Sequence, residues 1–182
     1  MGMLKDKNIV IGVTGGIAAY KACSVVSYLV KEGANVDVIM TSHAKEFITP
    51  LTLETLSKNK VVDDMFERPD NMDVKHISLA SKADLFLIAP ATANIVGKVA
   101  NGIADDMLST TIMATRAPVL FALAMNNGMY ENRIVQDNVN KLKEYGYKFI
   151  DPEDGRLACG TTAKGKLAKT KTIINRIKEE LK

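Results

Sequence analysis

Four short apolar runs divide the chain, and three of them are nearly continuous rather than alternating. They cover residues 8–13, 36–40, 85–89 and 118–122, and a weaker fifth run covers 147–150. Continuous runs of this length are typical of strands buried on both faces, as in a parallel sheet. The pattern therefore predicts a central parallel sheet.

Helical spacing of apolar residues fills much of the chain between these runs. It is found in residues 17–31, 131–145 and 170–181, and Gly33 follows the first of them as an expected helix end. Strands that alternate with helices predict an α/β fold, here a three-layer, doubly wound parallel sheet of the Rossmann-like kind with right-handed crossovers. No internal repeat or linker interrupts the pattern, so residues 1–182 are expected to form one domain.

The ends of the predicted strands share an unusual chemistry. In an open parallel sheet, ligands bind outside the carboxyl ends of the strands. Here none of those ends contains Asp, Glu, Lys or Arg, and small, hydroxyl and amide residues would let a flat ligand approach the backbone closely. The four ends are Thr14-Gly15-Gly16-Ile17, Thr41-Ser42-His43, Pro90-Ala91-Thr92-Ala93-Asn94 and Leu123-Ala124-Met125-Asn126.

Composition narrows the class of protein. The 182 residues are 47% hydrophobic and 25% charged, which is typical of a soluble globular chain. The net charge of +3 is too small to indicate a nucleic-acid partner. The longest uncharged run, residues 117–130, is shorter than the ~18 residues that a membrane span needs. Two cysteines build neither a disulfide framework nor a four-ligand zinc site, so a cytoplasmic enzyme without a metal is expected.

The first glycine-rich turn suggests a phosphate site at the start of a helix. It reads Gly12-Val13-Thr14-Gly15-Gly16-Ile17 and departs from the dinucleotide fingerprint G-x-G-x-x-G, because Thr14 occupies the second glycine position. The second strand ends in Met40-Thr41-Ser42, without the acid that usually binds the ribose of NAD. A mononucleotide is therefore favoured over NAD, and a tight turn without a ligand stays open as an alternative.

Several single residues allow both a structural and a functional interpretation. Pro90 is not expected to continue a central strand. Thr92 suits the cap of the next helix as well as a ligand. His76 is one of two histidines, and a lone histidine is more often structural than catalytic. Asn126 follows a buried strand, where an amide is often only a turn former.

The second half of the chain holds a candidate nucleophile or acid. Cys159 lies in a Gly-, Thr- and Lys-rich stretch, residues 155–166, which is expected to be a mobile loop. A thiol near basic groups is more reactive than one on the apolar face of a helix, where Cys23 is expected. Arg156 beside it suits a bidentate pair with a phosphate or a carboxylate. By themselves these residues name no reaction.

A set of motifs is shared with one known group of proteins. They are Thr14-Gly15-Gly16-Ile17-Ala18-Ala19-Tyr20-Lys21, Phe47-Ile48-Thr49-Pro50-Leu51-Thr52, His76-Ile77-Ser78-Leu79, Ala89-Pro90-Ala91-Thr92-Ala93-Asn94, Gly102-Ile103-Ala104-Asp105-Asp106-Met107-Leu108-Ser109-Thr110, Ala124-Met125-Asn126 with Met129-Tyr130, and Leu157-Ala158-Cys159-Gly160. In this order and spacing they resemble the homo-oligomeric flavin-containing cysteine decarboxylases, and within them the branch that acts on 4′-phosphopantothenoylcysteine. The resemblance spans residues 7–169, nearly the whole chain.

The resemblance implies an FMN-dependent carboxy-lyase of coenzyme A biosynthesis that converts 4′-phosphopantothenoylcysteine to 4′-phosphopantetheine. A cysteine carboxylate cannot simply lose CO2, because the resulting carbanion has no electron sink. FMN would oxidise the substrate thiol to a thioaldehyde, and the C=S group would accept the electrons as CO2 leaves, giving an enethiol. The cycle is redox-neutral, so no NAD site is needed, and the cofactor supplies the difficult step.

The resemblance also implies roles for individual residues. His76 matches the acid or base that acts on the thiol in the oxidative half, and Cys159 matches the proton donor of the reductive half. Asn126 matches the amide that binds the substrate carboxylate, with Arg156 and Ala158 also at the substrate. Residues expected near FMN are Gly15, Gly16, Ile17, Thr41, Thr92, Ala93, Asn94, Ser109 and Ala124.

The resemblance also leads to expectations about the oligomeric state and the partners of the protein, and some residues differ from the family pattern. The resemblance implies a homotrimer or a dodecamer of trimers with the sites at subunit contacts, and a fused or separate phosphopantothenate–cysteine ligase as partner. The chain is thus a stand-alone enzyme or the N-terminal part of a fusion. Four residues depart from the family pattern: Leu123, Ile95, Thr161 and Ala163. Leu123 precedes Ala124-Met125-Asn126, and Thr161 and Ala163 follow Cys159, so the substrate side of the site is expected to differ from the family.

Three other functions compete with this one. A peptidyl-cysteine decarboxylase of lantibiotic maturation would share the fold but would not need Cys159, because its product remains an enethiol. Flavin prenyltransferases share the fold but not the set of His76, Asn126 and Cys159. A non-catalytic flavin-binding regulator would bind FMN and tolerate the change Cys159→Ser.

Overall fold

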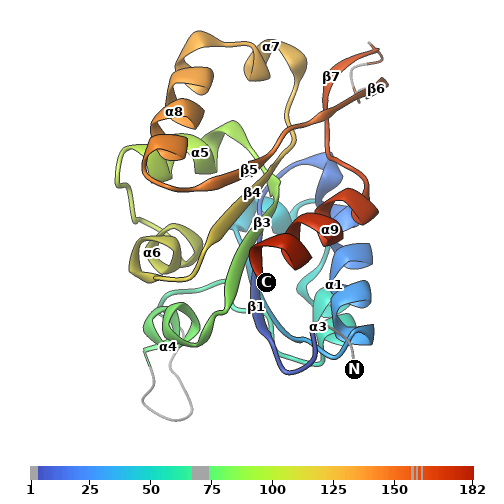
Figure 1. The fold of residues 1–182 in the computed structure, drawn as a ribbon, viewed down its shortest axis with the longest axis vertical. Helices are drawn as coiled ribbons and strands as arrows, with labels where there is room; N and C mark the ends of the chain where they lie inside the picture. Colours follow the sequence, from blue (N-terminus) through green and yellow to red (C-terminus); the bar gives the residue numbers. More distant parts are fainter. Residues whose placement is uncertain (1–3, 67–73, 157, 159, 161) are drawn as a thin grey trace.

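The computed structural model describes residues 4–66, 74–156, 158, 160 and 162–182. A five-stranded parallel sheet forms its centre, in the order β2-β1-β3-β4-β5 (Figure 1). The strands are β1 (Asn8–Val13), β2 (Asn35–Met40), β3 (Leu85–Ala91), β4 (Val119–Leu123) and β5 (Lys148–Ile150). The predicted parallel sheet is confirmed, and β1 to β4 are buried along almost their whole length because helices cover both faces.

Helices form the two outer layers (Figure 1). One face of the sheet carries η1 (Ile17–Lys21), α1 (Ala22–Lys31), α3 (Pro50–Ser57) and α9 (Thr170–Glu180). The other face carries α4 (Lys75–Lys82), α5 (Ala93–Ala100), α6 (Met107–Ala114) and α8 (Arg133–Glu144). Two short helices, α2 (Ser42–Lys45) and α7 (Asn127–Tyr130), come next after β2 and β4 along the chain. Each face has its own hydrophobic core, as a three-layer fold requires.

The order of the strands creates one reversal in the sheet. The chain leaves β1 for α1 on one face and leaves β3 for α5 on the other, so the two connections diverge at adjacent strand ends. A crevice opens at such a switch point, and in doubly wound sheets it is the usual place for a ligand. The fold therefore directs attention to the residues that follow β1 and β3.

One strand prediction was wrong at its end. β3 runs through Pro90 to Ala91 instead of stopping at Ala89, and the Ala89–Pro90 peptide is cis. Proline has no N–H to donate, and the pairing between β3 and β4 is irregular between Ile88 and Ala91. Pro90 is thus accommodated near the end of a central strand by a local change in the pairing register with β4.

The stretch expected to be a mobile loop also needs correction. β6 (Glu153–Arg156) pairs antiparallel with β7 (Thr162–Lys166) as a hairpin outside the main sheet. Its side chains are mostly exposed or half-buried, so the sequence lacks the alternating apolar residues by which a strand is recognised. Tertiary contacts hold it instead: the Met125 N–H donates to the Gly165 carbonyl at 3.1 Å.

The helical predictions were right in position but simpler than the structure. The segment 17–31 opens as a 3₁₀ turn, η1, before α1 begins, and the segment 131–145 is α8 alone, preceded by the separate α7. In the described part of the chain, no helix is both long and apolar enough to cross a lipid bilayer.

Candidate functional site

The floor of the crevice is a hydrogen-bonded contact between the ends of β1 and β3. The Thr14 hydroxyl donates to the Pro90 carbonyl at 2.6 Å and lies 3.3 Å from the Thr92 hydroxyl. The Thr92 N–H in turn donates to the Thr14 hydroxyl at 3.3 Å. Thr14 is only 2% exposed, so its hydroxyl acts as an internal connection between the two strands. Thr92 stands at the N-cap of α5, but its side chain makes no capping bond there.

Close backbone packing beside this floor requires a glycine. A Cβ atom on Gly15 would lie 2.3 Å from the His43 Cβ atom and 2.9 Å from the His43 carbonyl carbon. His43 is held there because Thr41 caps α2, accepting a hydrogen bond from the Ala44 N–H at 3.2 Å. The loop after β1 therefore packs directly against α2, with no room for a side chain between them.

The end of β4 presents an amide to the same crevice. The Ala124 N–H donates to the Ala91 carbonyl at 3.0 Å, which extends the sheet contact one residue beyond β4. Asn126 caps α7, and its Oδ1 atom accepts from the Gly128 N–H at 2.9 Å. This bond assigns the carbonyl end of the side chain to the helix and makes Nδ2 the donor end.

Three cations border the crevice on the hairpin side. Lys21 ends η1, while Arg156 and Lys166 belong to β6 and β7. Burial and the positive charge of Lys166 lower the pKa of Lys21, and the carboxylate of Glu153 partly offsets both effects. The mutual repulsion indicates that this rim is electropositive, a property that suits a phosphate or a carboxylate.

A charged network lies on the opposite side, where α6 begins. Asp106 caps α6: its Oδ1 atom accepts from the Ser109 N–H at 2.8 Å and from the Ser109 hydroxyl at 2.9 Å. The Lys98 ammonium contacts Asp106 Oδ2 at 2.7 Å and Asp105 Oδ1 at 2.6 Å. Although burial acts to raise it, the pKa of Asp106 is lowered by the hydrogen bonds from Lys98 and Ser109 and by the charge of Lys98.

These groups surround one pocket of about 810 Å³. Its volume lies in the range of roughly 300–1,000 Å³ that is typical of cofactor and small-molecule sites. It is lined by Thr14, Gly15, Gly16, Ile17, Ala18, Tyr20, Lys21, Thr41, His43, Pro90, Thr92, Asn94, Ile95, Asp106, Ala124, Met125, Asn126, Met129, Arg156, Ala158, Gly165, Lys166 and Leu167. The pocket therefore has small and apolar walls and a basic rim.

Most residues expected at a cofactor or substrate meet in this pocket. Its lining includes Gly15, Gly16, Ile17, Thr41, Thr92, Asn94, Ala124, Asn126, Arg156 and Ala158. Ala93 and Ser109 are not in the lining; Ser109 is fully buried and its hydroxyl belongs to the α6 cap. Cys159 lies outside the described residues. Cys23 is half-buried on α1, and burial raises the pKa of its thiol.

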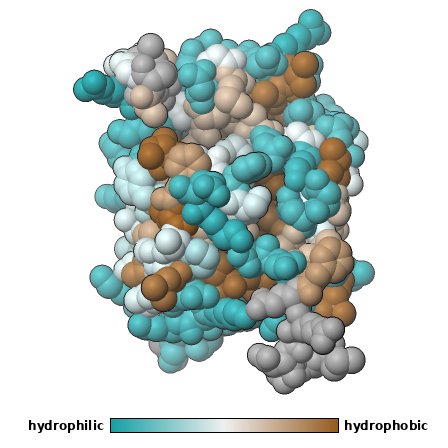
Figure 2. Space-filling view, turned by 180° about the vertical axis from the view of Figure 1, so that it is seen from behind, coloured by the Kyte–Doolittle hydropathy of each residue, from teal (hydrophilic) through white to brown (hydrophobic). Residues whose placement is uncertain are grey.

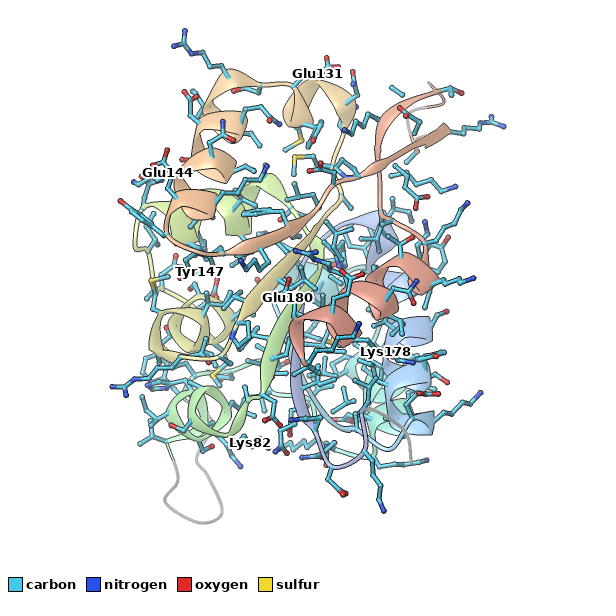
Figure 3. All side chains as sticks on the ribbon, in the orientation of Figure 1. Lys82, Glu131, Glu144, Tyr147, Lys178 and Glu180 are labelled. Carbon is cyan, nitrogen blue, oxygen red and sulfur yellow. The ribbon has the colours of Figure 1, made fainter. Side chains whose placement is uncertain are left out.

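His76 is separate from the pocket. It lies in the first turn of α4, which packs against α6, and it is not among the pocket-lining residues. Figure 3 labels Lys82 at the end of α4 and Glu131 just after α7 at opposite ends of the molecule. The histidine expected to act on the substrate is therefore not brought to the pocket by its own chain.

Sequence reasoning assigned no role to several pocket residues. Thr14 stands at a strand end where a ligand was expected, and Lys21 and Asp106 stand inside the shared motifs, but none of the three had a role of its own. His43 also stands at a strand end. Lys166 had no such signal, because its approach to the pocket depends on the pairing of β6 with β7.

The sequence matches a known family and known proteins over nearly its whole length. The model of the Flavoprotein family matches residues 1–182. The coenzyme A biosynthesis bifunctional protein CoaBC of Borreliella burgdorferi is 52% identical over 178 residues, which are 98% of this chain and 45% of that protein. A probable phosphopantothenoylcysteine decarboxylase of Streptococcus mutans is 47% identical, over 96% of this chain and 99% of that protein.

Solved structures show the same fold. A PPC decarboxylase mutant complexed with pantothenoylaminoethenethiol has a TM-score of 0.85 and 28% identity, over 96% of this chain and 98% of that one. The FMN-dependent cysteine decarboxylase SpaF has a TM-score of 0.84 and 28% identity, over 98% of each chain. The chain spans about half the length of two curated relatives it matches, the CoaBC proteins of Borreliella burgdorferi (45%) and Bacillus subtilis (42%).

Proposed function

Because the chain belongs to the Flavoprotein family, we propose that it binds FMN and decarboxylates 4′-phosphopantothenoylcysteine in coenzyme A biosynthesis. The observation that carries the proposal is the pocket where β1 and β3 end side by side. Its lining combines the amide of Asn126, a basic rim and small, uncharged residues at the strand ends. The names of the bacterial relatives and of the PPC decarboxylase structure support the substrate, and the FMN-dependent cysteine decarboxylase SpaF supports the cofactor.

The residues present fit FMN. Gly16 lines the pocket, and a Cβ there would meet only the Thr92 Cγ2 atom, at 3.8 Å, so the open space beside this backbone lets a planar ring or a phosphate approach. Gly15 also lines the pocket and lets the backbone pack against His43. Ile17, Ile95 and Met125 supply apolar wall, while Thr41, Thr92 and Asn94 supply polar groups. When bound, FMN would supply reversible two-electron oxidation of the substrate thiol.

Substrate would be held by the other side of the pocket. Asn126 Nδ2 would donate to the departing carboxylate; an uncharged donor suits a group that must lose its charge as CO2 leaves. Arg156, with Lys21 and Lys166 on the same rim, would bind the phosphate. Ala158 would contact the part of the substrate that lies between its carboxylate and its phosphate. Cys159 would donate the proton in the reductive half of the reaction.

We further propose that His76 acts in the pocket of a second copy of the chain, within a homotrimer or a dodecamer. The support is its position on α4, away from its own pocket, and the apolar side chains exposed near it. Val74, at the N-cap of α4, and Ile77, next to His76 in the helix, are 54% and 49% exposed. Figure 2 shows hydrophobic atoms exposed among hydrophilic ones on the back of the molecule. Burial against a second copy would remove this apolar surface from water.

The first experiment tests cofactor and substrate together. Purified protein should be yellow, or become yellow with added FMN, and should release CO2 from 4′-phosphopantothenoylcysteine with formation of 4′-phosphopantetheine. A protein that takes up no flavin would overturn the proposal. A flavin-bound protein that acts only on peptides ending in cysteine would instead belong with lantibiotic-maturing enzymes, and one that releases no CO2 from either substrate would be a binding protein.

Subunit complementation tests the position of His76. The variants His76→Asn and Asn126→Ala should each lose CO2 release, whereas Cys159→Ser should release CO2 and accumulate the enethiol. Unfolding and reassembling the first two variants together should restore part of the activity, because some mixed pockets combine an intact Asn126 with an intact His76. Absence of any restoration in confirmed mixed oligomers would show that both residues must come from one chain.

A further inference from the structure

The capping carboxylate of α6 has more contacts than a helix cap needs. Asp106 lines the pocket, and it is the carboxylate among the described residues of that lining. A cap requires only one oxygen, and Ser109 occupies Oδ1 through its N–H and its hydroxyl. Oδ2 faces the Lys98 ammonium at 2.7 Å. Asp106 is thus held ionised at the wall of a pocket whose other acceptors are neutral.

Oδ2 retains the capacity to accept from a ligand. An ionised carboxylate has about four lone-pair positions. Within the described part of the chain, three donors approach Asp106: the Ser109 N–H, the Ser109 hydroxyl and the Lys98 ammonium. The two oxygens are therefore not equivalent, because Oδ1 has two of these donors and Oδ2 has one.

Lys98 balances this charge without reaching the pocket. Its side chain is 19% exposed and it contacts both Asp105 and Asp106, so the cluster of one cation and two carboxylates has a net charge of −1. Asp105 is 59% exposed and is not in the pocket lining. Solvent screens Asp105 more strongly than Asp106, whose side chain is 33% exposed, so the less screened carboxylate of the two is the one at the pocket wall.

We propose that Asp106 is a further cofactor-contacting residue, which accepts a hydrogen bond from the ring imide N–H of the flavin and disfavours its reduction, and that Lys98 is a positioning residue that sets the strength of this effect. The inference rests on the proposed flavin site. A fixed negative charge beside the ring opposes the added electron density of reduced flavin, in the same way that a nearby like charge opposes ionisation. The bound flavin would then have a lower midpoint potential than the same pocket without this charge.

The midpoint potential of FMN bound to the full chain tests the proposal. Asp106→Asn keeps a good N-cap residue and removes the charge, so the potential should rise, and the Kd for FMN should increase by roughly tenfold for loss of one charge-assisted hydrogen bond. Lys98→Met should lower the potential, because it removes the compensating cation. Asp105→Asn is the matched control, with a shift less than half that of Asp106→Asn.

A higher midpoint potential in Asp106→Asn and a lower one in Lys98→Met would distinguish this electrostatic role from a structural one. A disturbed helix cap would lower the melting temperature of both variants but would not shift their midpoint potentials in opposite directions. An unchanged potential in Asp106→Asn, or an equal shift in Asp105→Asn, would overturn the inference. Should wild-type protein take up no FMN, the proposed flavin site itself would fail, and that result is separate from either outcome.

Discussion

Two regions enclose the pocket, and they are held in different ways. The strand ends of β1, β3 and β4 are buried and joined by short hydrogen bonds such as that from Thr14 to Pro90. The β6–β7 hairpin, by contrast, stands largely in solvent and is joined to the rest of the chain by bonds such as that from the Lys169 N–H to Glu153. A tightly packed floor and a more exposed rim suit different tasks: the floor fits an invariant cofactor, and the rim can adapt to a substrate.

The same substitution in each region should give the largest contrast. Gly15→Ala places a Cβ against the His43 backbone, which cannot move without displacing α2, so we expect FMN binding to be lost. Gly155→Ala brings its Cβ to 2.9 Å from the Lys166 Cδ atom, which a flexible side chain can relieve. Flavin titration of both variants measures the difference. Equal loss of binding in both would remove the distinction between floor and rim.

The Thr14 hydroxyl tests how far the floor depends on its buried hydrogen bonds. Thr14→Val keeps the shape but leaves the Pro90 carbonyl and the Thr92 N–H without this partner, which should lower the free energy of unfolding by about 1–3 kcal/mol. Thr14→Ser keeps the hydroxyl and serves as the control. Chemical denaturation of the three proteins gives the comparison, and a Val variant as stable as wild type would contradict it.

Acid should lower the stability of the protein through Asp106, at the start of α6 beside the buried part of the pocket. Its pKa is lower in the folded protein than in the unfolded chain, so its contribution to stability is complete above the unfolded pKa of ~3.9 and is lost as pH falls through the folded pKa. Melting temperatures at pH 7 and pH 3 should therefore differ more for wild type than for Asp106→Asn. An equal difference in the two proteins would show that the Lys98 contact contributes nothing to acid sensitivity.

The smallest effect is expected at the rim. Glu153→Gln removes a charge that favours protonated Lys21, so the pKa of Lys21 should fall further below its ordinary value. Stability should change by less than ~0.5 kcal/mol, because the site is partly exposed and Gln retains an acceptor for the Lys169 N–H. NMR titration of the Lys21 side chain measures the shift, with Glu144→Gln on α8 as the control that leaves it unchanged.

What could be predicted from sequence followed from local pattern. The buried strands and the glycine turn were identifiable because continuous apolar runs and Gly15-Gly16 have few alternative structures. The continuation of β3 through Pro90 could not be foreseen, because proline is rare inside central strands and the irregular pairing with β4 at this point is a feature of the tertiary structure. The β6–β7 hairpin was missed since its residues bury little apolar surface and so leave no periodic signal.

The amino-acid sequence alone determined which residue types of the candidate site stand at the strand ends, because each of them directly follows its strand along the chain. Which of them meet was decided only by tertiary structure. The strand order brings Thr14 to Thr92 across 78 positions, the hairpin brings Lys166 to Lys21, and the same packing leaves His76 on a distant helix. Such contacts depend on how sheet and helices pack together, which no local pattern of residues encodes.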